Sequence, residues 1–233
     1  MISVALCTHN GARYLNEQIL SICAQTLLPD EIVLSDDDSA DDSIEVVRDA
    51  LARGMAERSA QKSIDLMVLL NRPALRVTKN FEQAVRSCSG DLIALCDQDD
   101  AWAPDRLEVM AAEFASRPEL TLLHSDAWLV DSQGRRLSSM FSPLAVRPFE
   151  LAGIHNGRAF EVLIRRNLVT GATTMFRRSL LSSALPFPAE CVHDEWLGAI
   201  AAAVGAVDVL ERQLGDYRQH GSNQIGVKRE TFL

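Results

Sequence analysis

Three aspartates lie within four residues at the end of an apolar run, where their like charges repel one another. The apolar run covers residues 92–96, and the carboxylates belong to Asp97, Asp99 and Asp100. Water can screen Asp100, which lies near the start of the next helix. Hard oxygen ligands in a D-x-D arrangement favour Mg²⁺ or Mn²⁺, and two carboxylates leave the ion's remaining ligands to water and a phosphate. Asp97 and Asp99 therefore predict a divalent-metal site for a ligand that carries a diphosphate.

A second acidic stretch, SDDDSADDS at residues 35–43, follows another apolar run. Asp41 and Asp42 suit the N-terminus of the following helix, whereas Asp36 and Asp37 directly continue the expected strand. A calcium loop starting at either of these two lacks the glycine and the glutamate it needs at its sixth and twelfth positions. No histidine and cysteine cluster has zinc-ligand spacing, and neither a Walker loop nor G-x-G-x-x-G is present.

Apolar runs that alternate with helical patterns indicate an α/β fold in the first half of the chain. The expected strands are residues 2–7, 31–35, 65–70 and 92–96, and the expected helices are residues 13–25, 43–57, 79–87 and 104–116. This alternation implies parallel strands with right-handed crossovers and helices on both faces of the sheet. Because ligands bind beyond the carboxyl ends of such strands, we expect the two acidic stretches to meet at one edge.

The second half of the chain is less regular, and no linker or repeat divides it from the first. We expect a strand over residues 120–130, a loop over 138–156, a strand with a bend at Gly171 over 167–177, a helix over 194–204, a short strand over 207–210 and a polar tail from Gln213. The whole of residues 1–233 is therefore expected to form one domain.

The composition of the chain indicates which partners it disfavours and in which cellular compartment we expect it. The net charge of −9 comes without a basic tract, which disfavours nucleic acid as a partner. Five cysteines without C-x-x-C spacing predict a reduced, cytoplasmic protein. No basic region precedes the first apolar run, so we expect no signal peptide, and the longest uncharged apolar stretch, residues 197–207, is too short for a membrane span.

Four stretches in order resemble family-2 glycosyltransferases of the GT-A fold, whose sheet is Rossmann-like and mostly parallel. They are ISVALCTHNGARY through SDDDSADDS, then LIALCDQDDAWAPDRL, HDEW and YRQHGSN, and they span residues 2–223. Within the family the chain is most similar to bacterial rhamnosyltransferase-like members. The resemblance implies a nucleotide-sugar-binding half over residues 1–117 and an acceptor-binding half over residues 118–233.

The resemblance also implies an activity. The chain would transfer a sugar, with rhamnose as one candidate, from a UDP- or dTDP-sugar to a glycan or a lipid-linked saccharide. The transfer would invert the anomeric centre, would use Mg²⁺ or Mn²⁺, and would serve bacterial cell-surface polysaccharide synthesis.

The resemblance assigns catalytic and metal-binding roles to particular residues. Asp194 in HDEW matches the general base, and whether Glu195 shares that role stays open. Asp97 and Asp99 match the D-x-D motif, with Asp99 as the more direct metal ligand, and His220 matches a histidine that approaches the diphosphate or the metal. One departure lies beside the base, where His193 replaces the family's glutamate.

Further residues are expected to contact the donor. Thr8 and His9 end the first strand, where the family meets the nucleobase, and Asp37 matches the acid that reads the pyrimidine edge. Lys79 would face the donor, and Arg218 would stabilise charge on the leaving diphosphate. Trp102 would either stack on a sugar or pack beneath the acidic loop formed by residues 97–100.

Two other functions and a membrane surface stay open at this point. A non-catalytic GT-A domain would bind a nucleotide-sugar or a glycan without transferring a sugar. A nucleotidyltransferase would need a loop rich in Gly, Arg and Lys after the first strand, and THNGARY is poor in these residues. The arginines Arg165, Arg166, Arg177 and Arg178 are either solvated surface or a face toward anionic lipid, which would bring the protein to the inner face of the plasma membrane.

Overall fold

The computed structural model describes residues 1–58 and 62–221 as alternating strands and helices. The strands are β1 (Ile2–Thr8), β2 (Glu31–Asp36), β3 (Asp65–Leu70), β4 (Leu92–Cys96), β5 (Ala101–Trp102), β6 (Leu120–Val130), β7 (Arg136–Ser139), β8 (Met175–Arg177) and β9 (Ala206–Arg218). The α-helices are α1 (Ala12–Cys23), α2 (Ser43–Ala56), α3 (Val77–Ser87), α4 (Arg106–Ser116), α5 (Pro148–His155), α6 (Ala159–Leu163), α7 (Leu181–Ala184) and α8 (His193–Val204).

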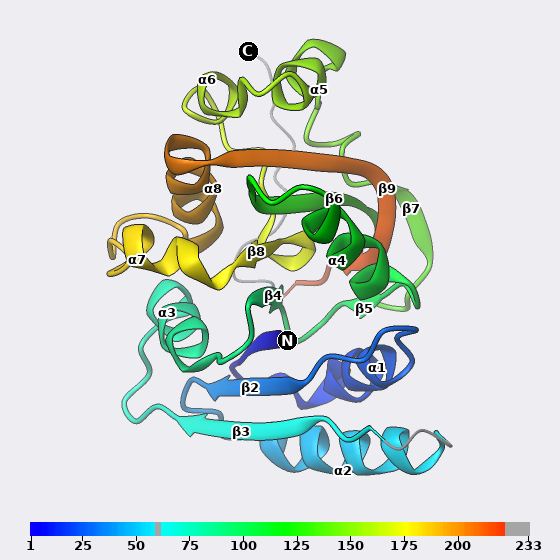
Figure 1. Ribbon diagram of the computed structural model, residues 1–233. Coiled ribbons are helices and arrows are strands. Elements are labelled where there is room, and N and C mark those ends of the chain that lie inside the picture. Colours follow the sequence, from blue (N-terminus) through cyan, green and yellow to red (C-terminus); the bar gives the residue numbers. More distant parts are fainter. Residues whose placement is uncertain (59–61, 222–233) are drawn as a thin grey trace.

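A nine-stranded sheet joins strands from both halves of the chain. Its order is β3-β2-β1-β4-β8-β6-β9-β5, with β7 paired to β6, and Figure 1 shows these strands stacked from β3 at the bottom to β9 near the top. Strands β1 to β4, β6 and β9 run in one direction, because β8 lies antiparallel between β4 and β6. This mostly parallel sheet confirms the predicted α/β class. The division of labour between residues 1–117 and 118–233 stays a prediction.

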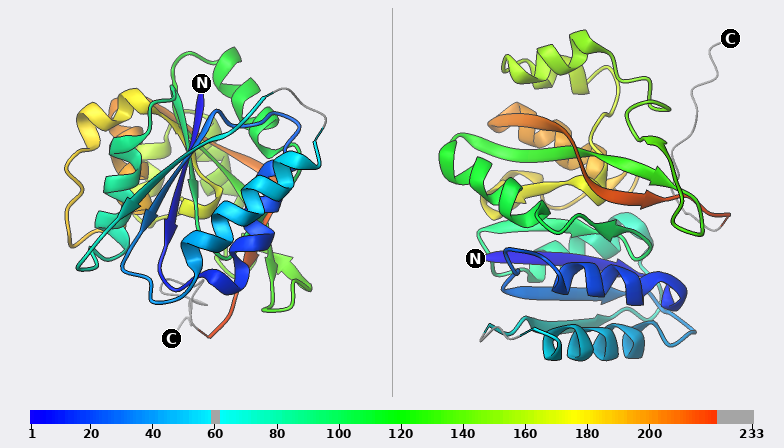
Figure 2. Two further views of the ribbon diagram at one scale, coloured as in Figure 1. Left: turned by 90° about the horizontal axis from the view of Figure 1, so that it is seen from below. Right: turned by 90° about the vertical axis from the view of Figure 1, so that its right-hand side faces the viewer.

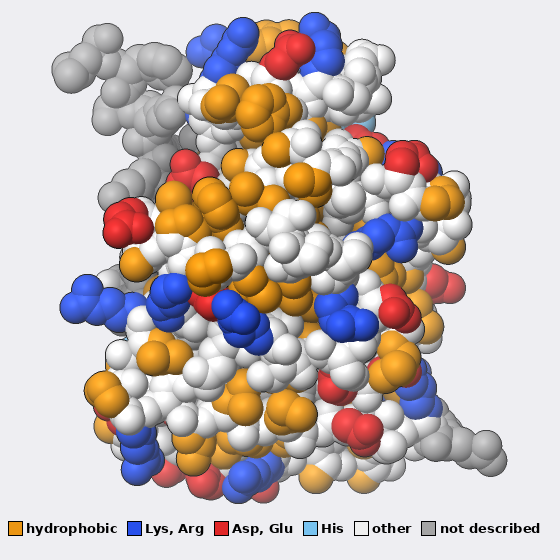
Figure 3. Space-filling model, turned by 60° about the vertical axis from the view of Figure 1, so that its left-hand side comes forward, with side chains coloured by type: hydrophobic (Ala, Val, Ile, Leu, Met, Phe, Trp, Pro, Cys, Tyr) orange, Lys and Arg blue, Asp and Glu red, His pale blue; other side chains and the backbone are white. Residues whose placement is uncertain are grey.

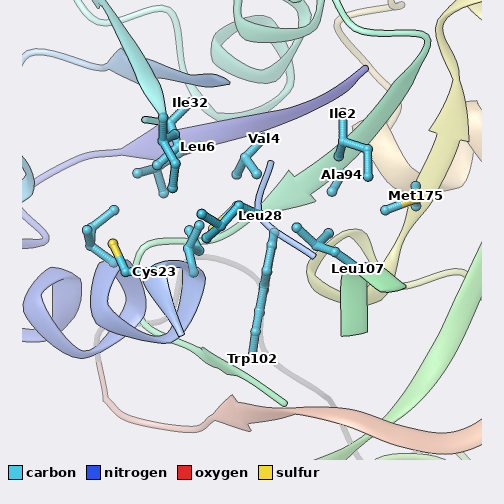
Figure 4. Close-up of a cluster of buried hydrophobic side chains, with 14 of the residues drawn as sticks. Ile2, Val4, Leu6, Cys23, Leu28, Ile32, Ala94, Trp102, Leu107 and Met175 are labelled. Atoms are coloured by element: carbon cyan, nitrogen blue, oxygen red, sulfur yellow. The ribbon is translucent and has the colours of Figure 1, made fainter. Parts of the chain in front are cut away.

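Helices cover both faces of the sheet, and the alternation of side chains along β1 shows why. Val4 and Leu6 pack into the cluster beneath α1, α2 and α4, whereas Ala5 and Cys7 pack into the cluster beneath α3 and α8. Successive strand residues point to opposite faces, so β1, which is buried on both sides, is mostly apolar. Figure 2 shows the two helical layers, and Figure 4 shows the first cluster around Val4, Leu6 and Trp102.

The predicted loop over residues 138–156 is wrong in part, because it contains the end of β7 and all of α5. Pro148 occupies the first turn of α5, and the carboxylate of Glu150 accepts the backbone N–H of Arg147 at 2.8 Å. Proline in a first helical turn and an acid three residues after the cap are both helix-start signals. Ser, Pro and Gly in the same stretch obscured them.

The C-terminal strand is also longer than expected. Strand β9 covers 13 residues and runs through the segment predicted to be a polar tail. Its pairing with β6 supplies the hydrogen bonds that the local sequence does not suggest. The strand expected over residues 167–177 shrinks to β8, preceded by a 3₁₀ turn over Gly171–Thr173. Within the described part of the chain, no helix has the length and apolarity to cross a membrane.

A buried imidazole in β6 makes the stability of this fold depend on pH. His124 lies in the interior, and neither of its ring nitrogens has a hydrogen-bond partner within residues 1–58 and 62–221. Burial lowers the pKa of His124 to about 4, whereas an unfolded histidine titrates near 6.5. Between about pH 4 and pH 6.5 the unfolded chain binds a proton at His124 that the folded chain does not bind. The contribution of His124 to the free energy of unfolding is therefore fully present above about pH 6.5 and is lost as the pH falls.

The free energy of unfolding of the wild type falls between pH 7.5 and pH 5. We expect this fall to be smaller by about 2 kcal/mol in His124→Phe. Urea unfolding of both proteins at the two pH values measures this difference. His155→Phe is the matched control, because His155 lies at the surface beside Asp208. An equal loss of stability with falling pH in the wild type and in His124→Phe would contradict the assignment.

Candidate active site

A cavity of about 770 Å³ lies beyond the carboxyl ends of β1, β2 and β4. The parallel strands bring these ends to one edge, as expected for an open α/β sheet. The first turn of α8 closes another side of the cavity. Seven of the predicted site residues line it: Thr8, His9, Asp37, Asp97, Asp99, Asp194 and His220.

The acidic loop after β4 carries its charges in a poorly solvated place. Burial raises the pKa of Asp97 well above its usual range, and the negative charges of Asp99 and Asp194 raise it further. Burial also raises the pKa of Asp99, although the hydrogen bond from His220 opposes this. Asp100 is buried too and accepts the backbone N–H of Arg218 at 2.9 Å, which corrects its interpretation as a solvated turn.

These residues fit a divalent cation through their donor chemistry. Two carboxylates at one cavity wall, each disfavoured as an anion by burial, gain from a nearby cation. No three His, Cys, Asp or Glu side chains in residues 1–58 and 62–221 are grouped to hold a metal by themselves. Such an ion would therefore need further ligands from substrate or water, as expected for a D-x-D site.

His220 was predicted as a metal ligand, which stays a prediction; in the structure its side chain lines the cavity and contacts Asp99. Its Nε2 lies 2.7 Å from Oδ2 of Asp99, and its ring stacks on Tyr14 with centroids 4.8 Å apart. Residues 222 and 223, which end the YRQHGSN stretch, lie outside the described part of the chain.

Asp194 lies in the first turn of α8, and two backbone N–H groups orient its carboxylate. Its Oδ2 accepts the N–H of Gly171 at 2.9 Å, and its Oδ1 accepts the N–H of Glu195 at 2.7 Å. Next to it, the buried ring of His193 stacks on Phe81 with centroids 3.9 Å apart. A carboxylate held in this way keeps a fixed position at the cavity wall and keeps lone pairs that can accept a proton.

The far end of the cavity is built around Asp37. Its carboxylate accepts the backbone N–H groups of Leu75 at 2.6 Å and Arg76 at 2.8 Å, so it also holds the turn before α3. The carbonyl of Asp37 lies 2.6 Å from Nδ1 of His9. Thr8 lines the same wall and donates its hydroxyl to Asp36.

Three predicted binding residues lie outside the cavity wall and have structural contacts instead. Lys79 donates to Glu82 at 2.7 Å and to the carbonyl of Phe187 at 2.6 Å. Trp102 is buried beneath the acidic loop, with the guanidinium of Arg106 stacked 4.3 Å from its ring centroid. The contacts of Lys79 correct its expected place facing the donor, whereas Trp102 takes the second of its two expected positions, packed in the interior and not on a sugar.

Arg218 is the third, and it connects β9 to the acidic loop. Its Nε donates to the carbonyl of Asp99 at 2.8 Å, and its Nη2 donates to Glu17 at 2.7 Å. The side chain is 3% exposed, so it does not reach a leaving group as predicted. It instead fixes the backbone that presents Asp99.

Gln98 is a site residue that the sequence did not single out. Its Oε1 accepts the backbone N–H of His9 at 2.8 Å, and its Nε2 donates to the carbonyl of His9 at 3.2 Å. Its position between the two aspartates of D-x-D was the available signal. The two hydrogen bonds tie the acidic loop to the end of β1.

Comparison with known proteins agrees with this geometry. The sequence model described as Glycosyl transferase family 2 matches residues 3–184. The chain belongs to this family. An uncharacterized glycosyltransferase of Nostoc sp. is 25% identical over 233 residues, covering 95% of this chain and 66% of the relative. O-antigen biosynthesis protein RfbC of Myxococcus xanthus is 28% identical over 169 residues, covering 72% of this chain and 12% of that protein.

Solved structures confirm the GT-A fold of this chain. Staphylococcus aureus TarS in complex with UDP-GlcNAc superimposes with a TM-score of 0.71 at 19% identity, covering 95% of this chain and 59% of TarS residues 1–349. Glucosyl-3-phosphoglycerate synthase from Mycobacterium tuberculosis, in complex with Mg²⁺ and UDP, gives 0.60 at 19% identity, covering 94% and 72%. The chain thus spans about 60% of the TarS fragment, and likewise 59% of an uncharacterized Mycobacterium tuberculosis relative.

We expect Arg218→Met to destabilise the protein by about 2–3 kcal/mol, because the substitution leaves buried acceptors unpaired. For a domain of this size the loss corresponds to a fall in Tm of about 5–10 °C. Arg212→Met is the matched control, since Arg212 pairs with Asp105 at the surface and should cost less than about 1 kcal/mol. Thermal unfolding of both variants compares them, and similar small shifts would argue against a clamp at Arg218.

Proposed function

We propose that this glycosyltransferase transfers a sugar from a UDP- or dTDP-sugar with inversion, using Mg²⁺ or Mn²⁺. The observation that carries the proposal is the placement of Asp194 at the wall of the cavity that also holds Asp97 and Asp99. A proton acceptor and a pair of metal-binding carboxylates thus share one space. Complexes of fold neighbours with UDP-GlcNAc, and with Mg²⁺ and UDP, support this choice of donor and cofactor.

The proposed base is Asp194. Inverting transfer is a single displacement, so it needs one group to take the proton of the acceptor hydroxyl and no enzyme nucleophile. The N–H groups of Gly171 and Glu195 donate to the two oxygens of the Asp194 carboxylate and fix its direction. Glu195 also lines the cavity but is exposed, which makes it the weaker candidate.

Asp99 and Asp97 are the proposed metal ligands, and His220 orients Asp99. When bound, the cation would offset the negative charge that develops on the leaving diphosphate. Thr8, His9 and Asp37 form the proposed wall for the nucleobase. Gln98 keeps this wall and the metal ligands in register, because it bonds both backbone groups of His9.

The proposed acceptor is a glycan or a lipid-linked saccharide of bacterial cell-surface polysaccharide synthesis. Similarity to an O-antigen biosynthesis protein supports this class, and rhamnose is our candidate sugar from the rhamnosyltransferase-like motifs. The five cysteines are free, and four of them are buried, in keeping with a reducing compartment. We therefore place the reaction in the cytoplasm, at the inner face of the plasma membrane.

We expect Asp194→Asn to lower the transfer rate by at least about a hundredfold, because the amide cannot accept the proton. Donor binding should change less than about threefold, since the isosteric amide leaves the cavity shape unchanged. Product formation from UDP- and dTDP-sugars measures the first effect, and calorimetric titration with the same donors measures the second.

Glu195→Gln is the matched control for this variant and should keep most of the activity. Full activity of Asp194→Asn would rule out Asp194 as the base. Donor binding by the wild type without transfer to any saccharide acceptor would instead indicate a non-catalytic binding domain.

In the wild type we expect a nucleotide-sugar donor to raise the Tm of the protein when Mn²⁺ is present. Asp99→Asn should abolish this rise, because the variant loses a charged ligand of the cation. A thermal-shift screen of UDP-, dTDP- and GDP-sugars with and without Mn²⁺ measures this. Asp105→Asn is the control, since the Asp105 side chain pairs with Arg212 and does not cap α4. Equal losses in the two variants would refute Asp99 as a ligand of the cation.

A further inference from the structure

An exposed apolar face lies on the α5–α6 pair, at the top of Figure 1. Phe149, Phe160 and Ile164 expose 60%, 45% and 68% of their surface. All three fall within 16 residues of sequence, Phe149 on α5, Phe160 on α6 and Ile164 directly after α6, and the two helices pack against each other. Figure 3 shows hydrophobic side chains beside Lys and Arg side chains over this part of the molecule. Large apolar groups gathered in this way mark an interaction site more often than scattered ones do.

Exposed basic side chains lie on the same helix pair as these apolar groups. Arg147, Arg158 and Arg165 are exposed on the same two helices and their ends, where Glu161 is the exposed acid. The guanidinium of Arg147 lies 5.9 Å from the ring centroid of Phe149. A local excess of positive charge in a chain of net charge −9 indicates an anionic partner.

The helix pair is held firmly, so the exposure of its outer side chains does not come from loose packing. Arg166 forms an ion pair with Glu150 at 2.7 Å and donates to the carbonyls of Leu144 and Ala145. On the inner side, Ile154 and Leu163 belong to the buried cluster under α8.

The helix pair is also connected to the active-site cavity. Leu144, just before α5, and Asn167, just after α6, both line that cavity. The Arg166 contacts join these two flanking segments. A surface that meets the outer side of α5 and α6 would therefore lie next to the cavity wall.

We propose that the α5–α6 face docks on the surface of an anionic phospholipid bilayer. Phe149, Phe160 and Ile164 enter the headgroup and acyl boundary, and the three arginines pair with lipid phosphates. This inference deepens the proposed function, because it identifies the surface that brings the cavity to a lipid-linked acceptor. Bilayer binding needs neither donor nor metal, so it can fail while the proposed transfer holds.

The test is sedimentation of the protein with vesicles of phosphatidylglycerol and phosphatidylcholine (1:1), and with vesicles of phosphatidylcholine alone. We expect binding to the anionic vesicles, weakened at high salt. The variant R147Q/R158Q/R165Q should bind more than tenfold more weakly, since each basic residue near such a surface contributes about fivefold. The variant F149S/F160S/I164S should lose binding to a similar extent. Circular dichroism and thermal unfolding check that both variants fold.

The control variant M67S/L70S/L75S removes exposed apolar groups around β3, at the opposite end of the sheet. It should bind anionic vesicles like the wild type. Equal binding by all variants would overturn the assignment, as would the absence of binding to both kinds of vesicle. A wild-type dimer that F149S/F160S/I164S abolishes, without vesicle binding, would overturn it too and would assign the face to a second copy of the chain.

Discussion

The arrangement of this molecule depends on keeping the carboxylates of one short loop buried and close together. Asp97, Asp99 and Asp100 follow β4 directly, and burial raises the pKa of each above its usual range. Water would screen such charges better than protein does. The fold retains them because groups from the end of β9 reach back to the loop. Arg218 donates its backbone N–H and its side chain there, and His220 bonds Asp99.

This dependence links the two halves of the chain. The loop belongs to the parallel β1–β4 part of the sheet, whereas its support comes from β9, more than a hundred residues later. Strand β8 lies between the two parts and lets β6 and β9 continue the direction of β4. The start of α8 then presents Asp194 at the wall of the cavity that the loop also lines. Docking of β9 against β6 thus completes both the sheet and the site.

The same logic explains why several charged residues support the site without facing its ligand. Lys79, Arg106 and Arg218 carry the positive charge that a diphosphate would seek, but each is occupied by the protein itself. Arg106 is fully buried near the acidic loop, and its charge is one of the few that offsets Asp97 and Asp100. The negative charge that remains at the cavity wall supports the proposed binding of a divalent cation.

The sequence by itself determined the α/β class, the strands β1 to β4, and the meeting of Asp37, Asp97 and Asp99 at one sheet edge. Apolar periodicity and the shared direction of parallel strands are local or topological properties, so they can be read from residue order. Only the tertiary structure decided the length of β9 and which side chains face the cavity. Arg218 and Trp102 have residue types suited to ligand contact, yet packing turns both inward. Side-chain direction depends on neighbours distant in the sequence, which no local pattern records.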